Sequence, residues 1–165
     1  MAPSMAQQAP RAWDIDKGIT DPERFFALLP TVFPQATLFF VEGSPAKDVV
    51  RCYKQYANPG PFLPGKDAFL GLSWGFRCSA SPAFFQALSE LGKRYHDDDH
   101  RGIGDHLSLY EGDRQLFHWH DSFANAFMLD GSLPESTVAA LAKPFGCRYS
   151  RVRFVGESGS SLTSA

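Results

Sequence analysis

The stretch that decides the fold is Asp105 to Leu129, DHLSLYEGDRQLFHWHDSFANAFML, which holds three of the five histidines. Short runs rich in Leu, Tyr, Phe and Trp lie on either side of Gly112 and Asp113, and this pattern predicts a β-hairpin. Residues 125–129 follow as a third strand. Consecutive strands joined by a short turn indicate a mainly antiparallel sheet.

The number of residues in the hairpin loop decides which side chains share a face, because a slip of one residue moves every side chain to the other face. An odd loop, 111–113, places the polar set His106, Ser108, His118 and His120 opposite the apolar set Leu107, Leu109, Phe117 and Trp119. An even loop places Leu107 and Leu109 with Leu116 and His118, and it moves Phe117 and Trp119 to the side of His106 and Tyr110. We expect the odd loop, because it separates polar from apolar side chains more cleanly.

With either loop, His118 and His120 point the same way, because they lie two residues apart on one strand. Such a pair can begin a site for zinc or another divalent transition metal. The candidates to complete the ligand set are His96, His100 and Asp121. We expect these to be ordinary histidines on a solvated sheet face and the protein to have no cofactor, and the divalent-metal site is the alternative.

An acidic run, Asp97, Asp98 and Asp99, lies between His96 and His100. It can hold a divalent metal, present negative charge to a basic partner, or be a solvated loop, as charge runs usually are. We expect Tyr110 and Trp119 to be exposed aromatic side chains. Together with the acidic run, they form the predicted partner-binding set.

Composition narrows the class of protein. A chain of 165 residues with 44% hydrophobic residues is long enough for one domain with a proper core. The net charge of −2 and the pI of 6.2 give no reason to expect nucleic acid or an anionic membrane as a partner. No apolar run approaches the ~20 residues of a transmembrane helix. The first residues lack the features of a signal peptide, and three cysteines without CxxC spacing fit reduced thiols. We therefore expect a cytoplasmic protein.

The order of predicted elements indicates the fold class. We expect a disordered lead over residues 1–12, a single α+β domain over 13–155, and a disordered Gly/Ser tail over 156–165. Within the domain, four helices are predicted at 22–29, 45–56, 82–95 and 134–145. Clear strands are predicted at 37–41, in the hairpin, at 125–129 and at 147–155. The prediction is a two-layer sandwich, with a mainly antiparallel sheet of about five strands and the helices packed on one face.

Sequence motifs argue against the commonest enzyme classes. The chain lacks the GxSxG elbow and the GxGxxG and GxxxxGK[ST] phosphate-binding patterns. In size and build it is similar to the small α+β proteins that serve as immunity or adaptor modules in the bacterial cytoplasm, an analogy of fold alone. We therefore expect a non-enzymatic module that binds another protein. The alternative is a metal-dependent hydrolase built around His118 and His120, and a third hypothesis is a small-ligand pocket between sheet and helices.

Overall fold

The computed structural model describes residues 11–60, 75–95 and 102–153. His96, His100, the acidic run 97–99 and the proposed tail 156–165 lie outside the described residues. The predictions made for them, and for residues 1–10 of the proposed lead, therefore stay predictions.

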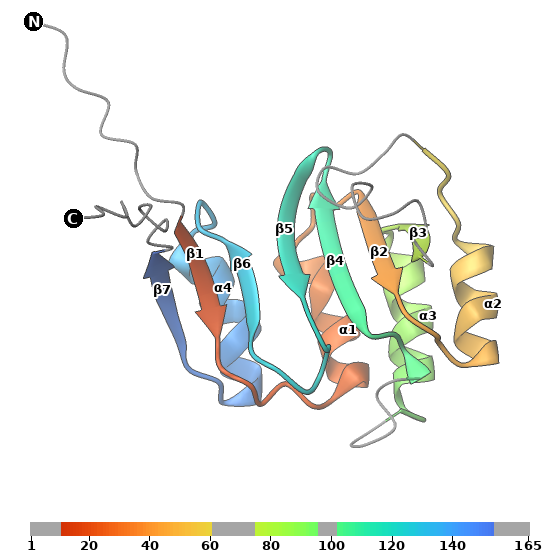
Figure 1. Ribbon diagram of the computed structural model, residues 1–165, viewed down its shortest axis with the longest axis horizontal. Coiled ribbons are helices and arrows are strands. Elements are labelled where there is room, and N and C mark those ends of the chain that lie inside the picture. Colours follow the sequence, from red (N-terminus) through yellow and green to blue (C-terminus); the bar gives the residue numbers. More distant parts are fainter. Residues whose placement is uncertain (1–10, 61–74, 96–101, 154–165) are drawn as a thin grey trace, which may run out of the picture.

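A seven-stranded sheet forms the centre of the molecule, and every neighbouring pair of strands is antiparallel (Figure 1). The order across the sheet is β3-β2-β4-β5-β6-β1-β7. The α+β class and the antiparallel sheet are confirmed, whereas the expected number of about five strands is wrong. The strands are β1 Arg11–Ile15, β2 Leu38–Glu42, β3 Gly75–Ser79, β4 His106–Glu111, β5 Arg114–Trp119, β6 Phe127–Asp130 and β7 Tyr149–Arg153.

Strand β1 was not predicted, and the proposed disordered lead included its first two residues, Arg11 and Ala12. This part of the prediction is wrong. Trp13 and Ile15 enter the core, and β1 pairs with β6 on one side and with β7 on the other. A five-residue strand containing Arg and Asp has a weak strand pattern of its own, and pairing on both edges stabilises it.

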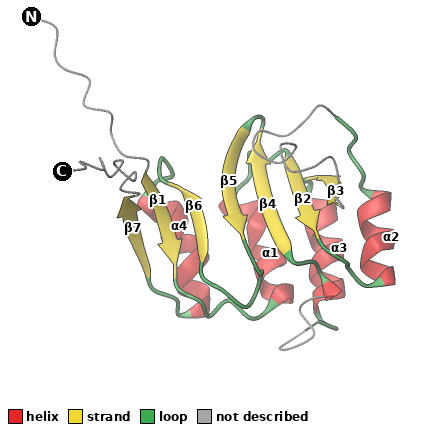
Figure 2. Cartoon of the chain, in the orientation of Figure 1, coloured by secondary structure: helices red, strands yellow, loops and turns green. Residues whose placement is uncertain are grey.

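Helices α4, α1 and α3 lie behind the sheet in the view of Figure 2, and α2 stands beside β3 at its edge. The helices are α1 Pro22–Val32, α2 Lys47–Gln55, α3 Pro82–Gly92 and α4 Glu135–Ala142, which a short 3-10 helix, η2 Lys143–Phe145, extends. The side chains of Asp21 and Ser81 cap the first turns of α1 and α3, where a proline occupies the first helical position. Helix α1 continues through Pro30 for two further residues, so its predicted end at Leu29 is wrong.

Aromatic rings fill the space between the sheet and α1. The ring of Phe25 is fully buried. It contacts five other aromatic rings, those of Phe26, Phe117, Trp119, Phe123 and Phe127, with centroids 5.1 to 6.2 Å away. The strands at the centre of the sheet are thereby fixed to the helix layer, because most of these rings come from β5, β6 and the segment between them.

The central hairpin has an even turn and a β-bulge. Glu111 pairs with Arg114 across the two turn residues Gly112 and Asp113, so the expected odd loop is wrong. A register shift between Leu109 and Tyr110 then leaves Leu116 as an extra residue in β5. Beyond the shift, Ser108 pairs with His118 and Leu107 with Trp119. The predicted separation of polar and apolar side chains is therefore correct, although a bulge produces it and not an odd loop.

No helix in the three described ranges is long and apolar enough to cross a membrane.

Candidate functional site

We call the side of the sheet that carries His106, Ser108, His118 and His120 the histidine face. Its histidines come from the two central strands and the residue after β5. The rings of His106 and His120 are stacked, with centroids 4.2 Å apart and planes 15° from parallel. The ring of His118 is 6.4 Å from that of His106. Three imidazoles are thus gathered in one place by cross-strand pairing of β4 and β5.

A backbone hydrogen bond fixes the protonation pattern of neutral His106. The amide of Asp121 donates to His106 Nδ1 over 3.1 Å. Because a backbone N–H can only donate, Nδ1 must be the acceptor, and the ring proton of neutral His106 is on Nε2. Protonation of Nδ1 would place two donors against each other at this contact.

The segment 120–126, which connects β5 to β6, is held by hydrogen bonds at several points. Ser122 donates from its amide to Asp105 O and from Oγ to Gly104 O. Asp121 and Phe123 have φ values of +48° and +64°, a region that non-glycine residues rarely adopt. Phe123 is nevertheless buried against Phe25 and Trp119. The core packing of Phe123 thus stabilises an unusual backbone that presents the Asp121 amide to His106.

His118 belongs to a different hydrogen-bond network. Its Nδ1 lies 2.9 Å from Ser108 Oγ, and Gln115 Nε2 donates to Ser108 Oγ and to the Tyr110 hydroxyl. Ser108 is fully buried, so its hydroxyl cannot meet a substrate as a nucleophile in this structure. The pair therefore orients the His118 ring and does not form a Ser–His catalytic dyad.

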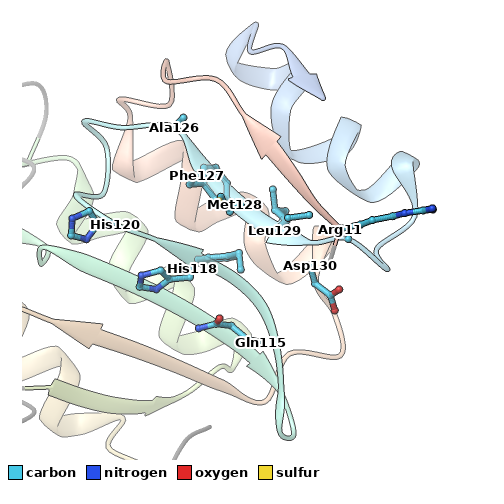
Figure 3. A pocket seen from close by; sticks show the side chains of 12 residues that line it. Arg11, Gln115, His118, His120, Ala126, Phe127, Met128, Leu129 and Asp130 are labelled. Atoms are coloured by element: carbon cyan, nitrogen blue, oxygen red, sulfur yellow. The ribbon is translucent and has the colours of Figure 1, made fainter. Parts of the chain in front are cut away.

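A hollow of ≈ 480 Å³ opens where β5 and β6 diverge. These two strands are paired at only two positions, Phe117 with Leu129 and His118 with Met128. Figure 3 shows Gln115, His118 and His120 along β5 on one side of the hollow, residues 126–130 along β6 on the other, and the Arg11 side chain pointing away. The lining combines an apolar floor with a polar rim. The residues are Arg11, Ala12, Gln115, Phe117, His118, His120, Ala126, Phe127, Met128, Leu129, Asp130 and Gly131.

The charges at the Asp130 end of the hollow are already paired with each other. Arg114 pairs with Asp130, whose carboxylate also accepts bonds from the amide and hydroxyl of Ser132. Burial alone would raise the pKa of Asp130, but the bonds from Ser132 and Arg114 outweigh it and lower the pKa below its usual value. Asp130 is thus an ionised residue in the wall of the hollow, and its carboxylate already has hydrogen-bond partners.

The structure changes the predicted partner-binding set. Tyr110 and Trp119 are both 0% exposed, which removes the exposure on which their assignment rested. Trp119 lies in the core and donates to Asn125 O, while Tyr110 packs with Leu38 and Phe40 on the histidine face. Both were misjudged because aromatic residues near a turn have no sequence signal that distinguishes burial from exposure.

The predicted metal residues are only partly brought together. His120 and Asp121 lie next to each other, with His120 Nε2 and Asp121 Oδ2 3.6 Å apart. The third residue beside them is His106, which the sequence-based set omitted, while His118 is held by Ser108. One ligand atom each from His106, His120 and Asp121 can be chosen so that all three lie within 4.8 Å of one another. The signal was available, because pairing Ser108 with His118 places His106 across from His120.

Comparison of the chain with protein-family models, with curated proteins and with solved structures gives no match.

Proposed function

We propose that the protein is a non-enzymatic binding protein whose ligand occupies the hollow between β5 and β6. The observation that carries the proposal is the shape and lining of this hollow. Its volume of ≈ 480 Å³ lies within the roughly 300–1,000 Å³ of small-molecule sites. The proposal takes the sheet and helices as a two-layer sandwich, in which one sheet face is left to bind a ligand.

The lining indicates the class of ligand. Met128, which pairs with His118, offers an apolar side chain, and His118, His120 and Gln115 place polar atoms along one rim. Phe127 and Leu129 line the hollow from below, because their side chains are buried in the core. A small amphipathic molecule suits this arrangement, with an apolar ring or chain over β6 and a hydrogen-bonding head group toward β5. Such a ligand replaces water over the apolar floor, and the rim then sets its orientation.

The protein-binding function expected from the sequence stays a prediction that depends on Asp97, Asp98 and Asp99, since Tyr110 and Trp119 are buried. The metal-dependent hydrolase likewise stays a prediction. Neither is supported by an observation as specific as the hollow.

The test uses 8-anilinonaphthalene-1-sulfonate, a fluorescent probe with apolar rings and an anionic head. We expect saturable binding of one probe molecule per chain. Met128→Trp places a large side chain in the hollow and should weaken binding by about tenfold or more, equivalent to at least ~1.4 kcal/mol. Ser150→Trp is the matched control, because Asp14 pairs with both Met128 and Ser150 and the three lie in one row across the sheet.

The melting temperature and near-UV circular dichroism of each variant must be measured alongside, because this probe also binds partly unfolded chains. Folded Met128→Trp protein that binds the probe as tightly as the Ser150→Trp control would disprove a ligand site in the hollow.

A further inference from the structure

We propose that His106, His120 and Asp121 form a binding site for one divalent transition-metal ion. The proposal rests on their proximity, with one ligand atom from each residue within 4.8 Å of the others. The residues come from the start of β4 and from the two positions that follow β5. The site is therefore positioned by the pairing of the two central strands.

The donor set selects the kind of ion. Two imidazole nitrogens and one carboxylate oxygen suit Zn²⁺, Co²⁺ or Ni²⁺, whereas Mg²⁺ and Ca²⁺ prefer oxygen ligands alone. Three protein ligands leave a fourth tetrahedral position for water or another molecule. His120 also lines the hollow, so the site adjoins the hollow.

The side chains must rearrange to bind the ion. The lone pair of an imidazole nitrogen lies in the plane of its ring, and the planes of His106 and His120 are only 15° from parallel. In-plane lone pairs of stacked rings do not converge on one ion. The side chain of His120 is 67% exposed, so its ring has room to turn toward Asp121.

Metal binding also competes with the hydrogen bond from the Asp121 amide. His106 Nδ1 accepts this bond, which leaves the ring proton on Nε2. An ion bound at Nδ1 replaces the amide directly, and an ion bound at Nε2 moves the ring proton to Nδ1, where it faces the amide. In either case the bond is lost, so the hydrogen-bonded and metal-bound states exclude each other.

Ion binding is measured by titrating the protein with Co²⁺ and following visible absorption, with Zn²⁺ competition to confirm the site. Three variants remove one ligand each: His106→Asn, His120→Ala and Asp121→Asn. Asparagine at 106 keeps an acceptor near the Nδ1 position and so preserves the bond from the Asp121 amide. His118→Asn is the matched control, because it removes a histidine from the same face while keeping a partner for Ser108.

We expect one equivalent of Co²⁺ on the wild-type protein and on His118→Asn. Each ligand variant should bind it at least about tenfold more weakly, the scale of loss expected when a ligand or its support is removed. In wild-type protein the Asp121 amide resonance should shift on Zn²⁺ addition and lose its protection from hydrogen exchange. The proposal is overturned if wild-type protein takes up no Co²⁺, or if the three ligand variants bind Co²⁺ as tightly as wild type does. It is also overturned if His118→Asn loses Co²⁺ binding while His106→Asn retains it. Each outcome is independent of probe binding in the hollow.

Discussion

Asp48 in α2 binds the residues that follow α3, through both oxygens of its carboxylate. Oδ1 accepts from the Tyr95 hydroxyl over 2.6 Å, and Oδ2 accepts from Arg94 Nη1 over 3.1 Å. The bond from Tyr95 is the main cause that lowers the pKa of Asp48, and backbone amides and Arg94 add to it against the effect of burial. One carboxylate thus joins two helices that are distant in sequence.

This pKa shift predicts a loss of stability in acid. A carboxyl whose pKa is lower in the folded than in the unfolded chain stabilises the fold above the unfolded pKa, and the contribution is lost as the pH falls through the folded value. For Asp48, the loss should begin near its usual value of 3.8 and continue below it. Urea unfolding near pH 7 and near pH 3 measures it. Asp48→Asn should be less stable than wild type near pH 7, and the two should become similar in acid. A constant difference at both pH values would contradict this role.

The positions and hydrogen-bond partners of single residues could be predicted from the sequence only in part. The common face of His118 and His120 followed from strand alternation, whereas the place of His106 on that face depended on the loop length, which was predicted wrongly. The hydrogen bond between His118 and Ser108, and the stacking of His106 on His120, depend on side-chain rotamers and on a two-against-one bulge, which the sequence does not show. The acceptor role of His106 depends on the left-handed backbone at Asp121, for which sequence gave no signal.

At the scale of elements, the contact between α1 and α3 is close because of one glycine. A Cβ added at Gly92 would lie 2.7 Å from Glu23 N and 2.9 Å from Pro22 C, which are backbone atoms and cannot turn aside. Ser89 Oγ, one turn earlier in α3, donates to Glu23 O over 2.9 Å. The end of α3 therefore packs directly on the first turn of α1.

The substitution Gly92→Ala should have the opposite effect on stability to most glycine-to-alanine substitutions in helices. Alanine in place of a helical glycine normally stabilises by up to about 1 kcal/mol, but overpacking against fixed backbone costs about 1–3 kcal/mol. We expect a lower urea midpoint for Gly92→Ala. Gln86→Ala, at an exposed position of the same helix, should change stability by less than about 0.5 kcal/mol. An increase in the midpoint for Gly92→Ala would show that the helices do not approach this closely.

Helices were predicted better than strands. Asp21-Pro22 and Ser81-Pro82 are strong start signals, and both helices begin at the predicted proline. The end of α1 was wrong because the chain continues past Pro30 for less than a turn, close to a helix end where few hydrogen bonds are lost. Strand β1 was missed because most of what stabilises it, pairing with β6 and β7, is distant in sequence.

At the scale of the whole molecule, β1 joins the two ends of the chain. It lies between β6 and β7, and no other strand in the described part of the chain pairs with β7. Trp13 Nε1 donates to Leu133 O, and Arg151 lies over the Trp13 ring at 4.4 Å. The full order of the strands could not be predicted, because three of the six neighbouring pairs, β2–β4, β6–β1 and β1–β7, join strands that are not consecutive along the chain.

Deleting residues 1–15 should therefore do much more harm than deleting residues 1–10. The longer deletion removes Trp13 and Ile15 from the core and leaves β7 without its partner strand. We expect loss of cooperative thermal unfolding, recorded by near-UV circular dichroism, and recovery on adding a synthetic peptide of the β1 residues. The shorter deletion keeps β1 whole and is the control. Equal melting temperatures for the two deletions would show that β1 is dispensable.

The bulge at Leu116 has a consequence for how this chain changes in evolution. Loss of this one residue would remove the bulge and leave a regular ladder, with Phe117 still opposite Leu109 and His118 still opposite Ser108. A homologous chain can therefore be one residue shorter here and keep every histidine in place, at the expense of one core side chain. An alignment that rejects a gap inside a strand would shift these histidines out of register. The histidine face that the two chains share would then not be recognised.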